Sequence, residues 1–201
     1  IGGLAPGSGV GGQARFSADG NFISGASAGS LGAALSRYDR TTGLWTPLGD
    51  LGFPVDNTTS GGYAISGDGT TVVGNSWADT TGGYAYSHAI ASNATDGVMD
   101  LGTLFFGRST RANAVNGDGS VVVGYATSAS GQEAFRWAGG IMTGLGDFAG
   151  GSFSSRANGV SADGSVVVGS GSIVYPVEDD VPPGDAAFIW TADGGMEQLF
   201  D

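Results

Sequence analysis

The stretch Val160-Ser161-Ala162-Asp163-Gly164-Ser165-Val166-Val167-Val168-Gly169 decides the fold, because the chain contains a version of it four times. The other three copies occupy residues 16–25, 65–74 and 115–124. In every copy an Asp-Gly pair stands between two runs that are rich in apolar residues. Glycine reaches the positive φ angles of a tight turn, aspartate caps the turn with its own side chain, and valine and isoleucine suit the flanking strands. Each copy therefore predicts a β-hairpin.

Two further short strands follow each hairpin and complete a longer unit. The third strands are expected at residues 34–38, 87–90, 133–137 and 186–190, and the fourth at 44–48, 98–101, 141–145 and 196–199. The leucines that close the units, at 48, 101, 145 and 199, are 53, 44 and 54 residues apart. Four strands in each period of this length are typical of a propeller blade. The sequence predicts an all-β protein, a single β-propeller domain over residues 1–201, with four four-stranded blades at about 1–48, 49–101, 102–145 and 146–201.

The two ends of the sequence stand at the same point of the repeat. Residues 1–4 align with residues 145–148, the tail of a unit, and the chain stops at that point one unit later. This register favours a closed ring of four blades with adjacent termini. The alternative is a segment excised from a longer propeller or repeat array.

The charged residues are unusual in kind and in sign. The net charge is -12, all seven basic residues are arginine, and 16 of the 19 acidic residues are aspartate. Such an acidic chain is a poor partner for nucleic acid or for an anionic membrane surface. No apolar stretch approaches the roughly 18 residues of a membrane span. With no cysteine to form disulfides, this composition is compatible with an extracellular or bacterial cell-surface protein.

The third unit resembles a known family of bacterial repeats. Its motifs are Arg111-Ala112-Asn113-Ala114-Val115-Asn116-Gly117-Asp118-Gly119, then residues 133–137 (EAFRW) and 145–148 (LGDF). They are similar to the HAF-type bacterial extracellular repeat, and the resemblance covers nearly the whole chain. Unit one departs from it, since residues 38–45 (YDRTTGLW) look more like a kelch unit. The resemblance implies a secreted or surface-exposed protein, often part of an autotransporter-like passenger, and it implies no catalytic residues.

Two long connections between second and third strands are candidate ligand sites. Residues 75–86 and 171–185 are longer than their counterparts, and variable loops often carry function. In a four-bladed ring they would face each other across the axis. The candidate ligand-binding residues are Trp77, Asp79, Tyr84, Tyr86 and Tyr175, of which Trp77 is expected to be exposed. Such loops could hold a sugar chain, a cation or another protein, or they could be solvated decorations.

The acidic cluster in the second of these loops is a candidate calcium site. It comprises Glu178, Asp179, Asp180 and Asp185. Carboxylates are suitable calcium ligands, but the regular D-x-D-x-D-G spacing is missing. The Asp-Gly turns also offer oxygen ligands, although capping of the turn explains them without a metal. We therefore expect no cofactor, with Ca²⁺ as the alternative.

Residues for catalysis are scarce. Cysteine and lysine are absent and the single histidine, His88, falls on a predicted strand, which leaves little for nucleophilic or multi-histidine metal chemistry. The first expectation is a non-enzymatic structural, adhesive or filament-forming surface module. A carbohydrate-binding module and a polysaccharide-active enzyme using paired carboxylates are the alternatives. Uncharged outer strands further predict self-association through strand edges, or attachment to a further domain of a longer parent chain.

Overall fold

The structure, a computed structural model, describes residues 13–29, 32–52, 61–80, 84–174 and 184–199. These residues form fifteen strands and no helix. The strands are β1 (Phe22–Gly29), β2 (Gly32–Asp39), β3 (Leu44–Gly49), β4 (Gly61–Ile65), β5 (Val72–Thr80), β6 (Tyr84–Asn93), β7 (Gly97–Asp100), β8 (Thr110–Val115), β9 (Val121–Thr127), β10 (Gln132–Ala138), β11 (Ile141–Gly144), β12 (Ser155–Val160), β13 (Val166–Ile173), β14 (Gly184–Thr191) and β15 (Gly195–Gln198). The predicted all-β class is confirmed. Within the described ranges, no helix is long and apolar enough to cross a membrane.

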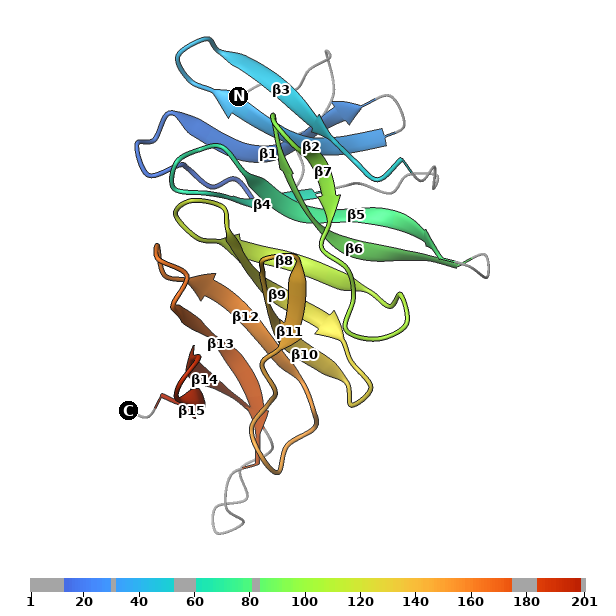
Figure 1. The fold of residues 1–201 in the computed structure, drawn as a ribbon, viewed down its shortest axis with the longest axis vertical. Helices are drawn as coiled ribbons and strands as arrows, with labels where there is room; N and C mark the ends of the chain where they lie inside the picture. Colours follow the sequence, from blue (N-terminus) through green and yellow to red (C-terminus); the bar gives the residue numbers. More distant parts are fainter. Residues whose placement is uncertain (1–12, 30–31, 53–60, 81–83, 175–183, 200–201) are drawn as a thin grey trace.

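The strands form four antiparallel sheets, each of which follows the chain order. Blade I is β1–β3, blade II β4–β7, blade III β8–β11 and blade IV β12–β15. In blade I the innermost position belongs to residues 13–16. There Phe16 forms a β-bridge to Ile23, and the backbone carbonyl oxygen of Arg15 accepts a hydrogen bond from Ser24 N at 2.9 Å. Every unit therefore has four strand positions, and the predicted third and fourth strands are confirmed to within a few residues. Figure 1 shows the four blades stacked one on the next.

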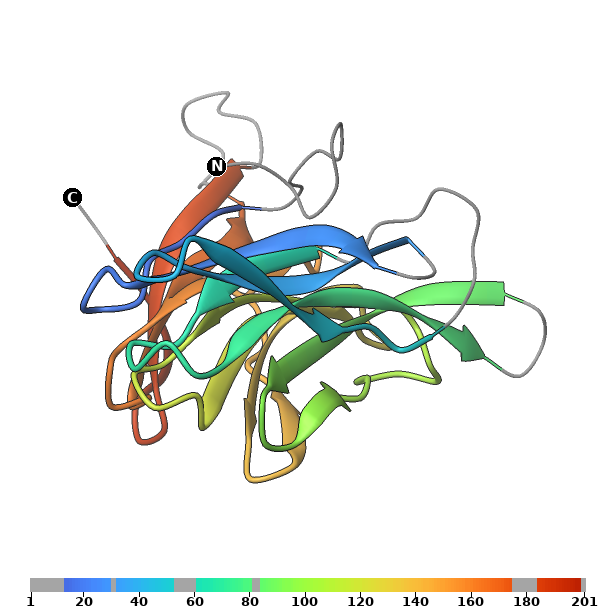
Figure 2. The ribbon, with the colours of Figure 1, turned by 90° about the horizontal axis from the view of Figure 1, so that it is seen from above.

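The Asp-Gly turns are closed by their own side chains. In blade IV, Asp163 Oδ1 accepts hydrogen bonds from Ser161 Oγ at 2.5 Å and from Ser165 N at 3.1 Å. Gly164 follows with a φ of +74°, in the left-handed region where a Cβ is disfavoured. These hydrogen bonds, first that from Ser161 and then those from Ser165, lower the pKa of Asp163 to about 2. The aspartate thus caps the turn, and Figure 2 shows the four turns gathered along one side of the molecule.

The turn aspartates predict sensitivity to acid. The pKa values of Asp19, Asp68 and Asp118 are also lowered, by hydrogen bonds of the same kind within their own turns. A carboxylate whose pKa is lower in the folded chain stabilises it above the unfolded value of about 3.9 and loses that effect as the pH falls through the folded value. We expect the melting temperature to fall between about pH 4 and pH 2, and Asp163→Ala to lower it at pH 7 but to flatten this fall. Thermal melts followed by circular dichroism measure both effects. A large rise in the melting temperature on adding Ca²⁺ at pH 7 would instead show that the turns bind metal.

Successive turns are linked by backbone hydrogen bonds. Ala18 N donates to Gly67 O at 2.8 Å, Asp68 N to Gly117 O at 3.0 Å, and Gly117 N to Ala162 O at 2.9 Å. A Cβ placed on Gly117 would lie 2.8 Å from Ala162 O, so glycine at this position allows the close approach of the next turn. These contacts fix the spacing of blades along one side of the stack.

The hydrophobic core lies between the blades. Val122 and Phe135 of blade III lie in the cluster that joins blade III to blade II, whereas Val123, Val167 and Phe188 lie in the cluster that joins blade III to blade IV. Phe135 and Phe188 are fully buried. Alternate side chains of one blade thus point into two different interfaces, as the pleat of a strand requires.

The blades form an open arc, so the expected closed four-bladed ring is wrong. Figure 1 places blades I and IV at opposite ends of the long axis, and the extensive packing between described strands of different blades joins consecutive blades. Val168 of blade IV is 41% exposed, whereas Val123 at the same repeat position is fully buried by the next blade. Likewise Leu199 is 50% exposed and its counterpart Leu145 only 8%. The described residues leave the outer face of blade IV uncovered, and residues 1 and 201 lie outside the described ranges.

Candidate functional site

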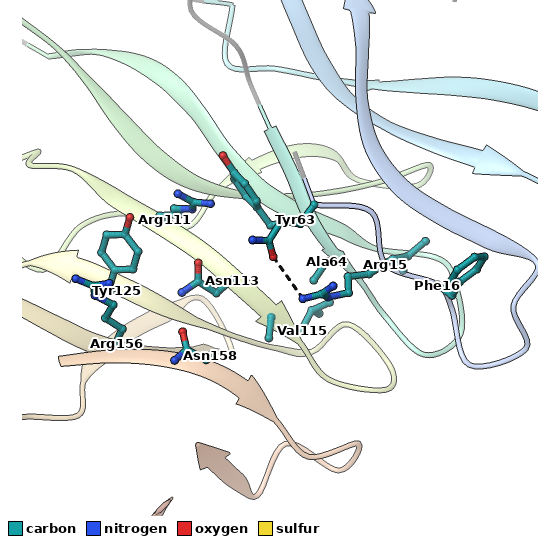
Figure 3. A pocket seen from close by; sticks show the side chains of 13 residues that line it. Arg15, Phe16, Tyr63, Ala64, Arg111, Asn113, Val115, Tyr125, Arg156 and Asn158 are labelled. Atoms are coloured by element: carbon teal, nitrogen blue, oxygen red, sulfur yellow. Dashed lines mark hydrogen bonds between the residues drawn. The ribbon is translucent and has the colours of Figure 1, made fainter. Parts of the chain in front are cut away.

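A cavity of about 610 Å³ lies along the inner strands of the arc. Its walls come from the segment 13–16 of blade I, from β4, β8 and β12, and from Tyr125 on β9. We call it the central basin, and its principal polar residues are Arg15, Tyr63, Arg111, Asn113, Tyr125, Arg156 and Asn158. Its volume falls in the range of sites that hold small ligands. Figure 3 shows these side chains gathered around one space.

A β-bulge at the same place in three innermost strands helps to form the basin. The register shifts between Gly62 and Ala64, between Ala112 and Ala114, and between Ala157 and Gly159. The residues at the three bulges are Tyr63, Asn113 and Asn158, which all line the basin. A bulge redirects a side chain and interrupts the ladder. The repeat therefore delivers one redirected polar residue from each of blades II, III and IV.

The glycine that ends each valine run allows the bulge to form. A Cβ on Gly124 would overlap the carbonyl oxygen of Arg111, and a Cβ on Gly169 would overlap that of Arg156. Both obstacles are backbone atoms, which cannot rotate away as a side chain can. The glycine of the sequence motif thus lets the second strand approach the arginine that precedes the bulge.

The basin is cationic in an acidic protein. Three of the seven arginines of the chain, Arg15, Arg111 and Arg156, line it, and none of the described lining residues is acidic. The only ion pair within the described ranges joins His88 to Asp100, so no carboxylate there neutralises these arginines. A guanidinium without a counter-ion is a ready partner for an anion. The charge of the basin is therefore opposite in sign to that of the whole chain.

Arg111 is held in place by stacking. Its guanidinium carbon lies 3.8 Å from the centre of the Tyr63 ring, a cation–π contact between blades II and III. Its Nε is buried and has no hydrogen-bond partner within the described residues. Asn113 Nδ2 donates to Ala157 O at 2.9 Å, which links blades III and IV at the same level. Arg15 and Arg156 are exposed, so they are accessible to a ligand.

The sequence contained a signal for this site. Arg-Ala-Asn recurs immediately before the turn in the third and fourth units, as Arg111–Asn113 and Arg156–Asn158. Charged and amide residues that recur on an apolar, innermost strand indicate a lined channel. The turns and the apolar core dominate the repeat pattern, so these polar positions do not stand out among the candidate site residues.

The predicted aromatic site is divided by the structure. Residues 75–80 extend β5 and residues 84–86 begin β6, so most of the expected loop is a hairpin. Trp77 pairs with Ser87 and Tyr86 with Ala78, so the Trp77 and Tyr86 side chains lie on opposite faces. Trp77 is half-buried, and the expectation that it is exposed is wrong, because Trp77 lies within strand β5 and pairs with Ser87 on β6. Tyr86 instead contacts Arg108, whose Nη1 donates to the Tyr86 hydroxyl at 3.1 Å.

The other predicted ligand residues fall partly on described strands and partly outside the described residues. Asp79 and Tyr84 occupy strand positions opposite Ala85 and Thr80. Asp185 is exposed on β14. Tyr175, Glu178, Asp179 and Asp180 lie outside the described residues. Among the described residues no group of three or more potential metal ligands comes together.

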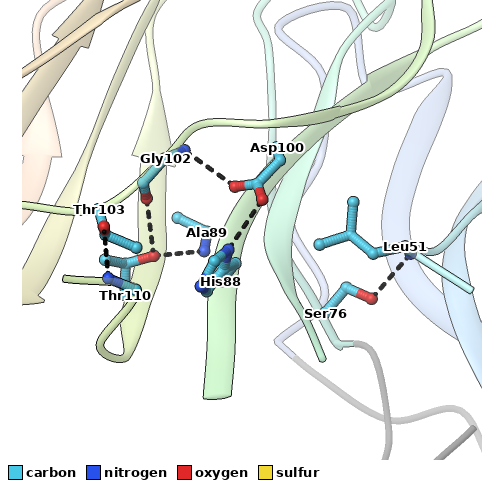
Figure 4. Close-up of polar contacts among 9 residues, drawn as sticks. Leu51, Ser76, His88, Ala89, Asp100, Gly102, Thr103 and Thr110 are labelled. Atoms are coloured by element: carbon cyan, nitrogen blue, oxygen red, sulfur yellow. Dashed lines mark hydrogen bonds and ion pairs between the residues drawn. The ribbon is translucent and has the colours of Figure 1, made fainter. Parts of the chain in front are cut away.

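His88 is packed between strands. Its Nδ1 lies 2.8 Å from Asp100 Oδ2, and Asp100 Oδ1 accepts from Gly102 N at 2.9 Å (Figure 4). The hydrogen bond to Asp100 raises the pKa of His88 against the effect of burial. Burial raises the pKa of Asp100, but the hydrogen bonds from His88 and Gly102 outweigh it, so that pKa is lowered. Both shifts favour the charged forms, so the pair stabilises blade II, in which the His88 side chain is buried.

This pair predicts a loss of stability in alkali. A histidine with a raised pKa contributes fully below its unfolded value of about 6.5 and loses its contribution as the pH rises through the folded value. The lowered pKa of Asp100 preserves its own contribution until the pH falls below the usual aspartate range. We expect Asp100→Asn to cost up to about 1 kcal/mol near pH 6, since Asp100 is partly exposed, and little at pH 9. Urea unfolding at both pH values measures this difference, and an equal cost at pH 6 and 9 would contradict the ion pair.

Comparison with known proteins shows the fold alone. No family model and no curated protein matches the chain, so the resemblance to HAF-type repeats stays a prediction. The structure is similar to TolB from Acinetobacter baumannii, with a TM-score of 0.59 and 18% identity, over 96% of this chain and 43% of that one. It is similar to a TolB candidate from Agrobacterium tumefaciens (0.59, 19%, 96% and 65%) and to the β-propeller domain of the Trilobed protease from Pyrococcus furiosus (0.57, 10%, 96% and 58%). The chain has a β-propeller fold and spans about half the length of these proteins.

Proposed function

We propose that this chain is a non-enzymatic, extracellular binding module that holds an anionic ligand in its central basin. The observation that carries the proposal is the charge of the basin, where three arginines stand without a described acidic partner. In a chain of net charge -12, the surrounding field repels anions. A group of unpaired arginines in a hollow is therefore an unusual local arrangement, and it provides the charge-assisted hydrogen bonds that bind carboxylate, sulfate or phosphate groups.

Isothermal titration calorimetry with charged and neutral probes tests this function. The anionic probes are trigalacturonate and tetraglutamate, and the neutral ones are maltotriose and tetraglutamine. We expect at least one anionic probe to bind, neither neutral probe to bind, and added salt to weaken binding. Arg156→Gln should weaken binding by about tenfold or more, the value of one charge-assisted hydrogen bond.

Arg40→Gln is the matched control. It removes the same charge from an exposed arginine that does not line the basin and whose Nη1 donates to Gly20 O in the Asp-Gly turn of blade I. Binding should be unchanged in this variant. An equal loss in both variants, or no binding of either anionic probe, would show that the basin is not an anion site.

The uncovered face of blade IV favours a second role in assembly. Val168 and Leu199 are exposed on it, although the same repeat positions are buried in blade III. An exposed apolar face of a sheet is a common contact surface. It supports the proposal that the chain self-associates or packs against a further domain of a longer parent chain, as a surface module of adhesive or filament type would.

A further inference from the structure

We infer that the ligand of the central basin is an acidic oligosaccharide, a chain of sugars that each carry a carboxylate. This inference rests on the proposed function, and it selects one class among anionic ligands. The basin repeats one recognition element on successive blades. In blade III, Arg111 is followed two residues later by the bulged Asn113, and in blade IV, Arg156 is followed in the same way by Asn158.

A repeated cation and amide suit a repeated ligand. Each sugar acid presents a carboxylate for a guanidinium and hydroxyl groups for an amide, which both donates and accepts hydrogen bonds. The three basin arginines, Arg15, Arg111 and Arg156, come from three different blades, I, III and IV. Three cations on separate blades suit a ligand that carries several negative groups better than an ion with a single charged group. The ligand is accordingly an oligomer with several negative groups.

The aromatic residues of the basin also fit a sugar. Tyr125 of blade III lines the same wall as Arg156 and Asn158 (Figure 3). A tyrosine offers an apolar ring face to a pyranose and a hydroxyl group that exchanges hydrogen bonds with it. Tyr63 contributes a second ring, one face of which is occupied by Arg111.

An acidic peptide is the competing ligand, and the bulges disfavour it. A peptide that binds at a sheet edge pairs its backbone with an unbroken strand. The innermost strands β4, β8 and β12 are edge strands, but each is interrupted by a bulge where it faces the basin. A bulge twists an edge and prevents regular pairing. The lining therefore offers side chains to a ligand and no continuous backbone ladder.

Calorimetry with three probes tests the inference on the 201-residue chain. The probes are trigalacturonate, its fully methyl-esterified form, which lacks the charges, and tetraglutamate. We expect trigalacturonate to bind at least tenfold more tightly than either of the others. Asn158→Ala, which removes an exposed amide, should weaken trigalacturonate severalfold and leave any tetraglutamate binding unchanged, whereas Arg156→Gln should weaken both.

The outcomes separate the inference from the function beneath it. If tetraglutamate binds as tightly as trigalacturonate, or if Asn158→Ala weakens both equally, the basin is a general or peptide-directed anion site, and the sugar inference falls while the proposed function stands. If the methyl ester binds as well as the acid, the site recognises neutral sugar and both fall. If no probe binds to a chain whose far-UV spectrum shows intact β structure, both fall as well.

Discussion

Gly124→Ala is expected to destabilise the chain by about 3 kcal/mol. The added Cβ would overlap the carbonyl oxygen of Arg111, and its other near neighbours, the carbonyl carbon of Arg111 and Cα of Ala112, are also backbone atoms. No side-chain rotation relieves such a contact, so either β9 moves away from β8 or the bulge at Asn113 changes shape. Overpacking of a well-packed interior costs about 1–3 kcal/mol, and the rigid obstacle places this case at the upper end.

Urea unfolding measures this cost, and Gly194→Ala is its control. Gly194 is exposed and has no positive φ, and a Cβ there would meet only side-chain atoms, the nearest of which is Oε1 of the flexible Glu197. The other is Thr191 Oγ1, which accepts a hydrogen bond from Gly194 N at 3.1 Å. We expect that variant to be neutral or more stable by a few tenths of a kcal/mol, because alanine restricts the unfolded chain. Because the bulge supports Arg111 and Asn113, Gly124→Ala should also weaken anion binding at temperatures where it is folded. A Gly124→Ala chain as stable as Gly194→Ala would mean that the bulge does not approach β9 as described.

The turns and the strand order could be predicted from the sequence because their causes are local. Asp163 caps its turn with hydrogen bonds to residues two positions away, and Gly164 has the positive φ that an Asp-Gly turn requires. Valines at alternate positions face the two neighbouring blades. Repetition of one pattern four times then gives the number of blades. Information within about ten residues was sufficient for each of these predictions.

The basin and the open arc depend on contacts between units, which no local pattern specifies. Arg111 of blade III contacts the Tyr63 ring of blade II. The bulge that redirects Asn113 is one extra residue in a strand that is otherwise regular. The sequence pattern does not predict the extension of β5 through Trp77, because Asp79, Thr80 and the following residues resemble a loop. The repeat register predicts a closed ring, but register carries no information about the angle between sheets. The angle between sheets decides whether four of them meet.

Val123→Asp and Val168→Asp are expected to differ by several kcal/mol, although the two valines occupy the same position of the repeat. Val123 is fully buried between blades III and IV, whereas the equivalent Val168 is 41% exposed on the free face of blade IV. An unpaired carboxylate buried at position 123 costs about 3–5 kcal/mol, a large part of the 5–15 kcal/mol that a domain of this kind possesses. At position 168 the carboxylate remains in water, and we expect a cost of about 0.5 kcal/mol.

Thermal melts at low concentration measure the stability of the two variant monomers. Sedimentation at high concentration measures whether the chain self-associates through the free face of blade IV. The open arc requires that only Val123→Asp lowers the melting temperature strongly in the monomer. If copies of the chain pack through blade IV, Val168→Asp should abolish their association without destabilising the monomer, since a charge would then be placed in an apolar contact. A wild-type chain that stays monomeric at every concentration would exclude self-association and leave packing against a further domain. A Val168→Asp monomer as unstable as Val123→Asp would mean that position 168 is buried in solution and that blade IV has no free face.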